Sequence, residues 1–264
     1  MLMDVVKAVF YTCSSYPKIA APHRYSISND YDICILSSIS SAIEVYSKVL
    51  RIVDEFKRGE RGLGGIEIGR NIARALSTTL QNIGYNMSIE MCIASVYLIY
   101  IDVFQEEAEA DFRKALRRVF NATLSTDTLD SIEFIKVLKN IGGGYHNLLD
   151  KADISERRIS LEGLSLGHVM DVLSKHHPVF ECFSNVQKVL DIVNQGDKIY
   201  TETRDINKTL SRLFIEIAKK SIDIPRESLT ELLKVDTIYR KKGVDLGYIV
   251  PCLVYPALYI IKQK

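Results

Sequence analysis

Apolar residues that recur every three or four positions constrain the fold of this chain more than any other feature. The clearest run lies within residues 33–56 and consists of Ile33, Leu36, Ile39, Ile43, Tyr46, Leu50, Val53 and Phe56. This spacing places the apolar side chains on one face of an α-helix, and Asp30 and Asp32 stand where N-terminal caps are expected. The alternation of apolar and polar residues that is typical of strands is nowhere sustained. The sequence therefore predicts an all-α protein.

The predicted bundle has a buried central helix. Residues 88–103 are mostly apolar with no clear polar face, a pattern that is typical of a helix covered on all sides. The glycine-rich stretch 59–65 separates the first long helix from a second at 66–83, which ends at Gly84. No internal repeat and no long linker divides the chain, so residues 1–264 are predicted to form a single-domain multi-helix bundle.

Shorter helical patterns follow along the chain. Acidic residues precede basic ones in the next helix, which predicts an exposed surface with an ion pair between Glu109 and Arg113. Polar caps at 125–128 open another helix, which the glycines at 142–144 are expected to end. The polar residues 150–160 predict a loop. Further helices are expected at 165–175, 179–194, 203–221, 228–234 and 237–250, and a buried terminal helix or pair of short segments at 248–261.

The charge balance limits the classes of partner. Lys and Arg number 34 against 33 Asp and Glu, so the chain has no overall field that would attract nucleic acid or an anionic membrane. A small phosphorylated ligand needs only a local cluster of cations. We therefore predict a small-molecule partner, a nucleotide or coenzyme, with no nucleic acid and no membrane, and leave open whether the chain forms a homo-oligomer.

The cysteines predict the compartment. They are odd in number, scattered and mostly flanked by apolar residues, with no Cys-x-x-Cys pair. These features favour reduced, buried thiols and a cytoplasmic protein. Residues 1–10 lack the pattern of a signal peptide, and the apolar stretch 248–261 is too short to span a bilayer. The cysteines are Cys13, Cys34, Cys92, Cys182 and Cys252.

Two apparent motifs do not support a chemical role. Gly64 and Gly69 have the spacing of a P-loop, but Arg70 follows where Lys is needed, and no strand precedes the segment. We interpret this segment as a turn between helices. His177 and Glu181 are four residues apart, as in some metal sites, but no third ligand is near in sequence. A structural metal is therefore not expected there.

The segment 16–24 is a stronger candidate for binding. It places Lys18, His23 and Arg24 in a loop between two helices, together with two prolines that restrict the backbone. Cations held rigidly at helix ends can bind phosphate through charge-assisted hydrogen bonds. An ordinary connection between helices is the alternative interpretation of the same residues.

Four segments, in order along the chain, resemble the motifs of one enzyme family. The first resembles Pro-Lys-Pro-Gly-x-Val-His-Arg and keeps Pro17, Lys18, His23 and Arg24. The second resembles Gly-Thr-Asn-Thr-Asn/His-Leu-Gly before an apolar helix and keeps Gly84 and Asn86. The third, at residues 122–128, resembles Ala-Thr-Thr-Val-Glu-Asp-Ala and is followed by the glycines at 142–144. The fourth, at residues 235–243, resembles Pro-Asp-Thr-Leu-Ile-x-Arg-Lys-x-Gly.

These motifs are those of the triphosphoribosyl-dephospho-CoA synthase family, in its archaeal-type form. The resemblance implies an all-α fold and a transfer of the triphosphoribosyl group of ATP to dephospho-CoA, with release of adenine. This reaction needs Mg²⁺, cations on the triphosphate and a carboxylate near the anomeric carbon. By position, Asp127 would bind Mg²⁺ or act as the catalytic base. The residues that would bind nucleotide or phosphate are Lys18, His23, Arg24, Asn86, Arg240 and Lys241.

Several positions depart from the family pattern. The alignment places Thr12 where the family has a glutamate, and His177 near an expected aspartate. Losing such a carboxylate removes charge stabilisation worth about two to three orders of magnitude in rate. The sequence therefore leaves two hypotheses: a divergent ATP-dependent transferase, or a catalytically degenerate helical protein that binds a nucleotide or a protein partner. Further departures are Ala20, Ala21, Met87 and Glu90.

Overall fold

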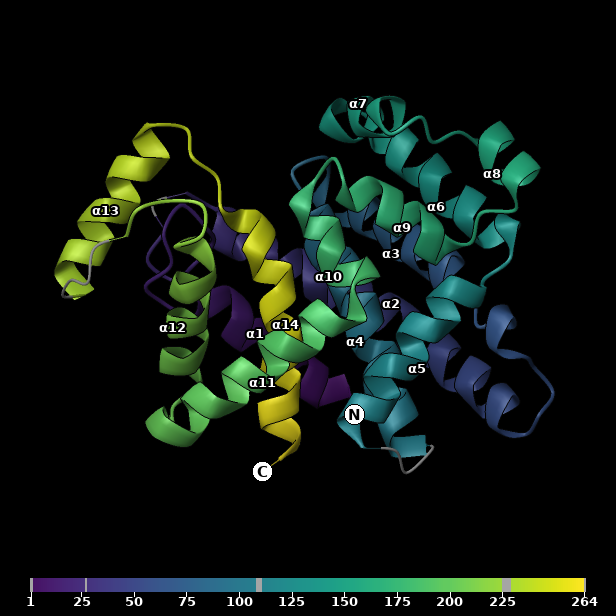
Figure 1. Ribbon diagram of the computed structural model, residues 1–264, viewed down its shortest axis with the longest axis horizontal. Coiled ribbons are helices and arrows are strands. Elements are labelled where there is room, and N and C mark those ends of the chain that lie inside the picture. The colour runs from purple at the N-terminus through teal and green to yellow at the C-terminus, as the bar shows by residue number, and fades with distance from the viewer. Residues whose placement is uncertain (1, 27, 108–110, 225–228, 264) are drawn as a thin grey trace.

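The computed structural model describes residues 2–26, 28–107, 111–224 and 229–263. The described residues are 78% helical and contain no strand. The predicted all-α class is therefore confirmed. Figure 1 shows α13 at one end of the molecule and α6, α7 and α8 at the other, with α14 and α4 between them.

The helices have the following bounds. The first half of the chain contains α1 (Leu2–Ser14), α2 (Asp30–Lys57), the 3-10 helix η1 (Leu63–Gly65), α3 (Ile68–Ile83), α4 (Ile89–Glu107), α5 (Phe112–Ser125) and α6 (Thr128–Ile141). The second half contains α7 (Gly143–Lys151), α8 (Glu156–Glu162), α9 (Leu166–Ser174), η2 (Pro178–Phe180), α10 (Glu181–Ser184), α11 (Val186–Thr203), α12 (Ile206–Ala218), α13 (Leu229–Lys241), η3 (Gly247–Ile249) and α14 (Val250–Lys262).

Helix α4 is the centre of the core. From Met91 to Phe104 every residue is buried, because α4 packs against α2, α3, α5, α14 and α1. Two of its aromatic side chains use their hydroxyls inside the core: Tyr97 donates to the Phe183 carbonyl at 3.2 Å, and Tyr100 donates to the Ile66 carbonyl at 2.6 Å. The prediction of a buried central helix is confirmed.

The long helix predicted behind Asp30 is α2. It packs on α4, α3 and α1 through a face that includes Val45 and Val49, both fully buried. The predicted apolar run coincides with this face only in part, because Leu36 and Ile43 are 54% and 60% exposed. Among the described residues, α2 is also the one helix that is long and apolar enough to cross a membrane by length and composition alone. In this structure the buried face of α2 contributes to the protein core.

Several predicted boundaries are wrong. Arg204 has a left-handed backbone (φ 53°) and separates α11 from α12, so the helix predicted at 203–221 begins only at Ile206. The loop predicted at 150–160 is shorter, because α7 continues to Lys151 and Ser155 caps α8 by accepting from the Arg158 amide.

Three other segments also differ from prediction. Gly142 ends α6, but the next two glycines already belong to α7. The two helices predicted within 228–250 are one helix, α13, followed by a turn and η3, and the predicted start at residue 228 lies outside the described residues. The region 179–194 is divided into η2, α10 and α11. The ion pair predicted between Glu109 and Arg113 falls outside the described residues.

Four of the five cysteines form disulfides, so the prediction that all are reduced is wrong. Cys13 is bonded to Cys34, and Cys182 to Cys252. The first bond joins the end of α1 to the start of α2, and the second joins α10 to α14. Only Cys92 is a free thiol, and burial raises its pKa to about 12. The prediction of burial is confirmed for all five.

The glycines with P-loop spacing have a packing role. A Cβ added at Gly64 would lie 2.4 Å from the Ser125 carbonyl oxygen, and one at Gly69 would lie 2.4 Å from the Asp130 carbonyl oxygen. Distances under 3 Å force atoms to move, and in both cases the obstructing atom is backbone. These two glycines therefore allow η1 to approach the end of α5, and α3 to approach α6.

Replacing Gly69 by Ala is expected to lower the free energy of unfolding by about 2 kcal/mol, because α3 and α6 must separate to admit the methyl group. Urea denaturation measures this change. The matched control is Gly62→Ala, since no atom lies within 4 Å of a Cβ there and the backbone is extended. Equal effects of the two substitutions would contradict this account of Gly69.

Candidate functional site

A cavity of about 960 Å³ lies where three segments meet. One wall comes from the loop between α1 and α2, with Ala20, Ala21 and Pro22, and from the start of α2. A second comes from residues 86–91 at the start of α4. The third comes from residues 237–250, which include the end of α13, the following turn and η3. These segments are far apart in sequence, so the cavity is a product of tertiary folding.

Buried Lys18 holds the loop between α1 and α2 in shape. Its Nζ donates to three backbone carbonyls, those of Thr12 at 2.6 Å, Cys13 at 3.2 Å and Pro22 at 2.5 Å. The first two carbonyls lie in the last turn of α1, where helix carbonyls lack intrahelical partners. Burial lowers the pKa of Lys18 to about 7. All three donors of the ammonium group are therefore used inside the protein.

Asp236 on α13 binds the same loop through two groups. Its Oδ1 accepts from the Ala20 amide at 2.6 Å, and its Oδ2 lies 3.3 Å from Nε2 of His23. The Tyr25 amide donates to Nδ1 of His23, so the proton of a neutral His23 ring is on Nε2 and points to Asp236. Burial raises the pKa of Asp236, but the hydrogen bonds from His23, Ala20 and Arg240 outweigh burial and leave it below its ordinary value.

Arg240 completes the connection between α13 and the loop. Its Nη1 donates to Asp30 at 2.8 Å and its Nε to Asp236 at 2.9 Å, while Nη2 donates to the Ala21 carbonyl. Burial lowers the pKa of Arg240, but Asp30 and Asp236 outweigh burial and raise it overall. Arg240 therefore lines the cavity as a cation that two carboxylates already neutralise.

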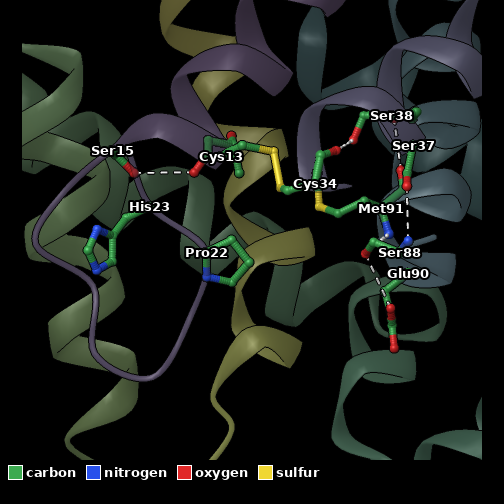
Figure 2. Close-up of a disulfide and its surroundings, with 12 residues drawn as sticks. Cys13, Ser15, Pro22, His23, Cys34, Ser37, Ser38, Ser88, Glu90 and Met91 are labelled. Carbon is green, nitrogen blue, oxygen red and sulfur yellow. Dashed lines mark hydrogen bonds between the residues drawn. A yellow bond between two sulfur atoms is a disulfide. The ribbon is translucent and has the colours of Figure 1, made fainter. Parts of the chain in front are cut away.

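The disulfide between Cys13 and Cys34 supports the same wall, and Cys34 itself lines the cavity. Figure 2 shows this bond between the loop that carries Pro22 and the start of α4. On the α4 side, the Ser88 amide donates to the Ser37 hydroxyl at 2.9 Å. Helices α1, α2 and α4 are thus linked next to the cavity.

The start of α4 contributes Asn86, Ser88 and Glu90 to the lining. Glu90 lies in the first turn of α4 and accepts hydrogen bonds from the hydroxyls of Ser88, at 3.4 Å, and Tyr145. Burial and the nearby Glu90 charge raise the pKa of Tyr145 well above its usual range. Tyr145 is therefore a protonated donor, and among the described residues the carboxylate of Glu90 has neutral partners only.

The predicted phosphate-binding residues of the loop do not line this cavity. Lys18 and His23 are fully buried behind its wall, where backbone carbonyls and Asp236 occupy them. Arg24 is exposed, donates to the Ser14 carbonyl at 3.3 Å and lies over the ring of Tyr16. In this structure the three residues organise and cover the loop, and their predicted role in phosphate binding stays a prediction.

Asn86, Arg240 and Lys241 do line the cavity, which brings the second and fourth family-like segments together with the loop of the first. Asn86 and Lys241 are both exposed at this site. Of the six residues predicted to bind nucleotide or phosphate, three therefore meet at one cavity. The other three belong to the loop that forms its wall.

Asp127 lies away from this cavity. Its carboxylate caps α6 by accepting from the Asp130 amide at 2.7 Å, and it pairs with the Arg70 guanidinium at 2.9 Å. Neighbouring Asp130 accepts from the amides of Gly69 and Arg70 at the start of α3. Asp127 is paired with Arg70, and each oxygen of Asp130 accepts from a backbone amide, so the two carboxylates do not offer the several free oxygen ligands that Mg²⁺ takes.

The described residues also contain no group of three or more His, Cys, Asp or Glu side chains that could hold a metal ion. Of the two residues with metal-site spacing, Glu181 pairs with Lys188, whereas His177 lines the cavity. The predicted Mg²⁺ site at Asp127 has no support from the geometry.

Sequence reasoning missed Asp236, and it assigned Arg240 to phosphate binding instead of to the organisation of the site. Asp236 and Arg240 are four residues apart on a helix, a spacing that predicts an ion pair, and both lie inside the fourth family-like segment. The sequence does not show that they hold the loop between α1 and α2, because their partners Ala20 and Asp30 are more than 200 residues away. Glu90 stood out only as a departure from the family pattern.

The fold and the site together define an all-α protein with a ligand-sized cavity of mixed apolar and polar lining beside the loop between α1 and α2. Comparison of the chain with protein-family models, with curated proteins and with solved structures finds no match. The resemblance to triphosphoribosyl-dephospho-CoA synthases therefore rests on the four short segments alone.

Proposed function

We propose that this protein binds a small nucleotide-type or coenzyme-type ligand in the cavity and does not itself transfer a group. One observation carries the proposal. Three residues predicted to bind nucleotide or phosphate (Asn86, Arg240 and Lys241) meet at the cavity, whereas the predicted catalytic carboxylate (Asp127) lies elsewhere and is paired with Arg70.

The size and lining of the cavity support this ligand class. Ligand sites commonly measure about 300–1,000 Å³, and this cavity measures about 960 Å³. Its apolar side chains, including Ile33, Met91 and Val250, offer surface for a flat base. Its polar side chains, including Asn86 and Ser88, offer hydrogen bonds to a sugar.

The arrangement of charges supports binding rather than catalysis. Transfer from the anomeric carbon of ATP calls for cations on the triphosphate and a carboxylate near the reacting carbon. Lys18 and Arg240 are fully engaged with protein acceptors. The expected carboxylate at Asp127 is ion-paired outside the cavity.

A large side chain placed in the cavity should weaken the binding of AMP. Thr237 lines it, whereas the next residue, Ile238, is 50% exposed and does not. In isothermal titration calorimetry with AMP, Thr237→Phe is expected to weaken binding at least tenfold, because the ring occupies ligand space. The control Ile238→Phe should bind AMP like the wild type. Equal binding by all three proteins would contradict the cavity as the site, and no heat with the wild type would contradict the proposed function.

Transfer of the triphosphoribosyl group is the second candidate. It is favoured by the ordered family-like segments, three of which contribute to the cavity or its wall. The test is incubation with ATP, dephospho-CoA and Mg²⁺, followed by chromatographic detection of adenine. Adenine released above an enzyme-free blank, and lost in Thr237→Phe, would replace the non-catalytic proposal with this one.

A further inference from the structure

The cations around the cavity are almost all committed to protein acceptors. Lys18 donates to three carbonyls behind the wall, and Arg240 is shared by Asp30 and Asp236. Among the described residues that line the cavity, Lys241 is the one Lys or Arg with no ion pair. Lys241 is therefore the lysine that is free to bind a phosphate group of a ligand.

Two carboxylates of the lining, by contrast, have no cationic partner among the described residues. Glu90 accepts only from the hydroxyls of Ser88 and Tyr145. Asp245 accepts only from the Gly247 amide, at 2.7 Å. Such carboxylates accept hydrogen bonds readily and attract donors such as hydroxyl and amino groups.

The start of α4 is the place where an anion would otherwise be expected, because helix N-termini carry partial positive charge. Glu90 lies in this first turn and already supplies a negative charge there. The lining as a whole has three carboxylates, on Asp30, Glu90 and Asp245, against the two cations of Arg240 and Lys241. The difference is one net negative charge, which repels a polyanion.

We infer that the ligand is a nucleoside with at most one phosphate group, whose hydroxyl and amino groups face Glu90 and Asp245 and whose phosphate meets Lys241. This inference rests on the proposed function, since it names the ligand class of the same cavity. It excludes ATP as the preferred ligand, although the four family-like segments imply ATP.

The test is calorimetric titration of the full chain with adenosine, AMP, ADP and ATP at low ionic strength, with EDTA so that no metal masks the phosphates. Adenosine or AMP is expected to bind at least tenfold more tightly than ATP. Glu90→Gln removes one negative charge from the cavity, so it should strengthen ATP binding and reduce the difference in affinity between AMP and ATP. Binding of ATP as tight as that of AMP would overturn the inference and leave the proposed function intact, whereas no binding of any compound would overturn both.

A second pair of variants tests the role of Lys241. Lys241→Gln is expected to weaken AMP binding about tenfold and to leave adenosine binding unchanged, because adenosine has no phosphate. The matched control is Lys242→Gln, since Lys242 lies over the Tyr239 ring and does not line the cavity. Equal losses for AMP and adenosine in Lys241→Gln, or a loss for AMP in Lys242→Gln, would contradict the assignment of Lys241 to the phosphate.

Discussion

Replacing Asp236 by Ala is expected to lower the free energy of unfolding by about 4 kcal/mol, because removal of one partner from a buried ion pair leaves the other groups uncompensated. Asp236 accepts from the Ala20 amide, His23 and Arg240, and it is 6% exposed. All three donors would lose an acceptor at once. The loop between α1 and α2 would also lose its two hydrogen bonds to Asp236, those of Ala20 and His23.

Urea denaturation measures this loss. The control is Asp171→Ala on α9, where the carboxylate is 61% exposed and pairs with Lys175 at 3.3 Å. An exposed pair of this kind contributes little, so the control should change stability by less than about 1 kcal/mol. If Asp236→Ala also lowered the free energy of unfolding by less than about 1 kcal/mol, the hydrogen bonds of Asp236 would not be what holds the loop between α1 and α2.

The cost of Asp236→Ala should depend on pH. The hydrogen bonds place the pKa of Asp236 in the folded protein below its ordinary value. The Asp236 carboxylate is therefore protonated more readily in the unfolded chain than in the folded protein. The stabilisation is therefore complete above the unfolded pKa of about 3.9 and is lost as the pH falls through the folded pKa. The difference in stability between wild type and variant should stay constant near neutral pH and shrink in acid. A difference that grew in acid would contradict this sign.

Removing the disulfide between Cys13 and Cys34 should lower the free energy of unfolding by about 3 kcal/mol, from the chain entropy of the loop that it closes. The bond spans 21 residues, from α1 to α2. These residues include most of the loop that forms one cavity wall. The double variant Cys13→Ala, Cys34→Ala should therefore also bind AMP more weakly.

The second disulfide provides the control for this effect on binding. Cys182 and Cys252 do not line the cavity, so the double variant that replaces both by Ala should lose stability and keep its affinity for AMP. Thiol titration of the denatured wild type, purified without reductant, should find one free thiol, that of Cys92. Five free thiols would contradict both disulfides, and equal losses of affinity in the two double variants would contradict the link to the cavity.

The helical architecture could be predicted because its signals are local. The apolar period of α2 and the mostly apolar sequence of α4 each lie within one stretch of sequence. The break at Arg204 could not be predicted in this way, because a left-handed backbone at a residue other than glycine has no simple signal. Helix existence therefore followed from the pattern, whereas several helix ends did not.

The candidate site was less predictable because tertiary contacts decide which charges are free. The sequence shows Lys18 and Arg240 as cations, but only the fold shows that carbonyls and carboxylates occupy them. The disulfides were missed for a related reason, since scattered cysteines do not reveal which of them meet. The prediction of a cytoplasmic protein rested on reduced thiols, so it stays a prediction without that support.

Photolabelling can show whether the cavity is the place where this protein binds a nucleotide. The wild-type protein would be irradiated with 8-azido-AMP, digested and mapped by mass spectrometry, with and without excess AMP. The account predicts labels within residues 20–34, 86–91 or 237–250, which supply most of the cavity lining, and loss of these labels when AMP competes. Labels confined to other segments, or labels that AMP does not displace, would contradict it.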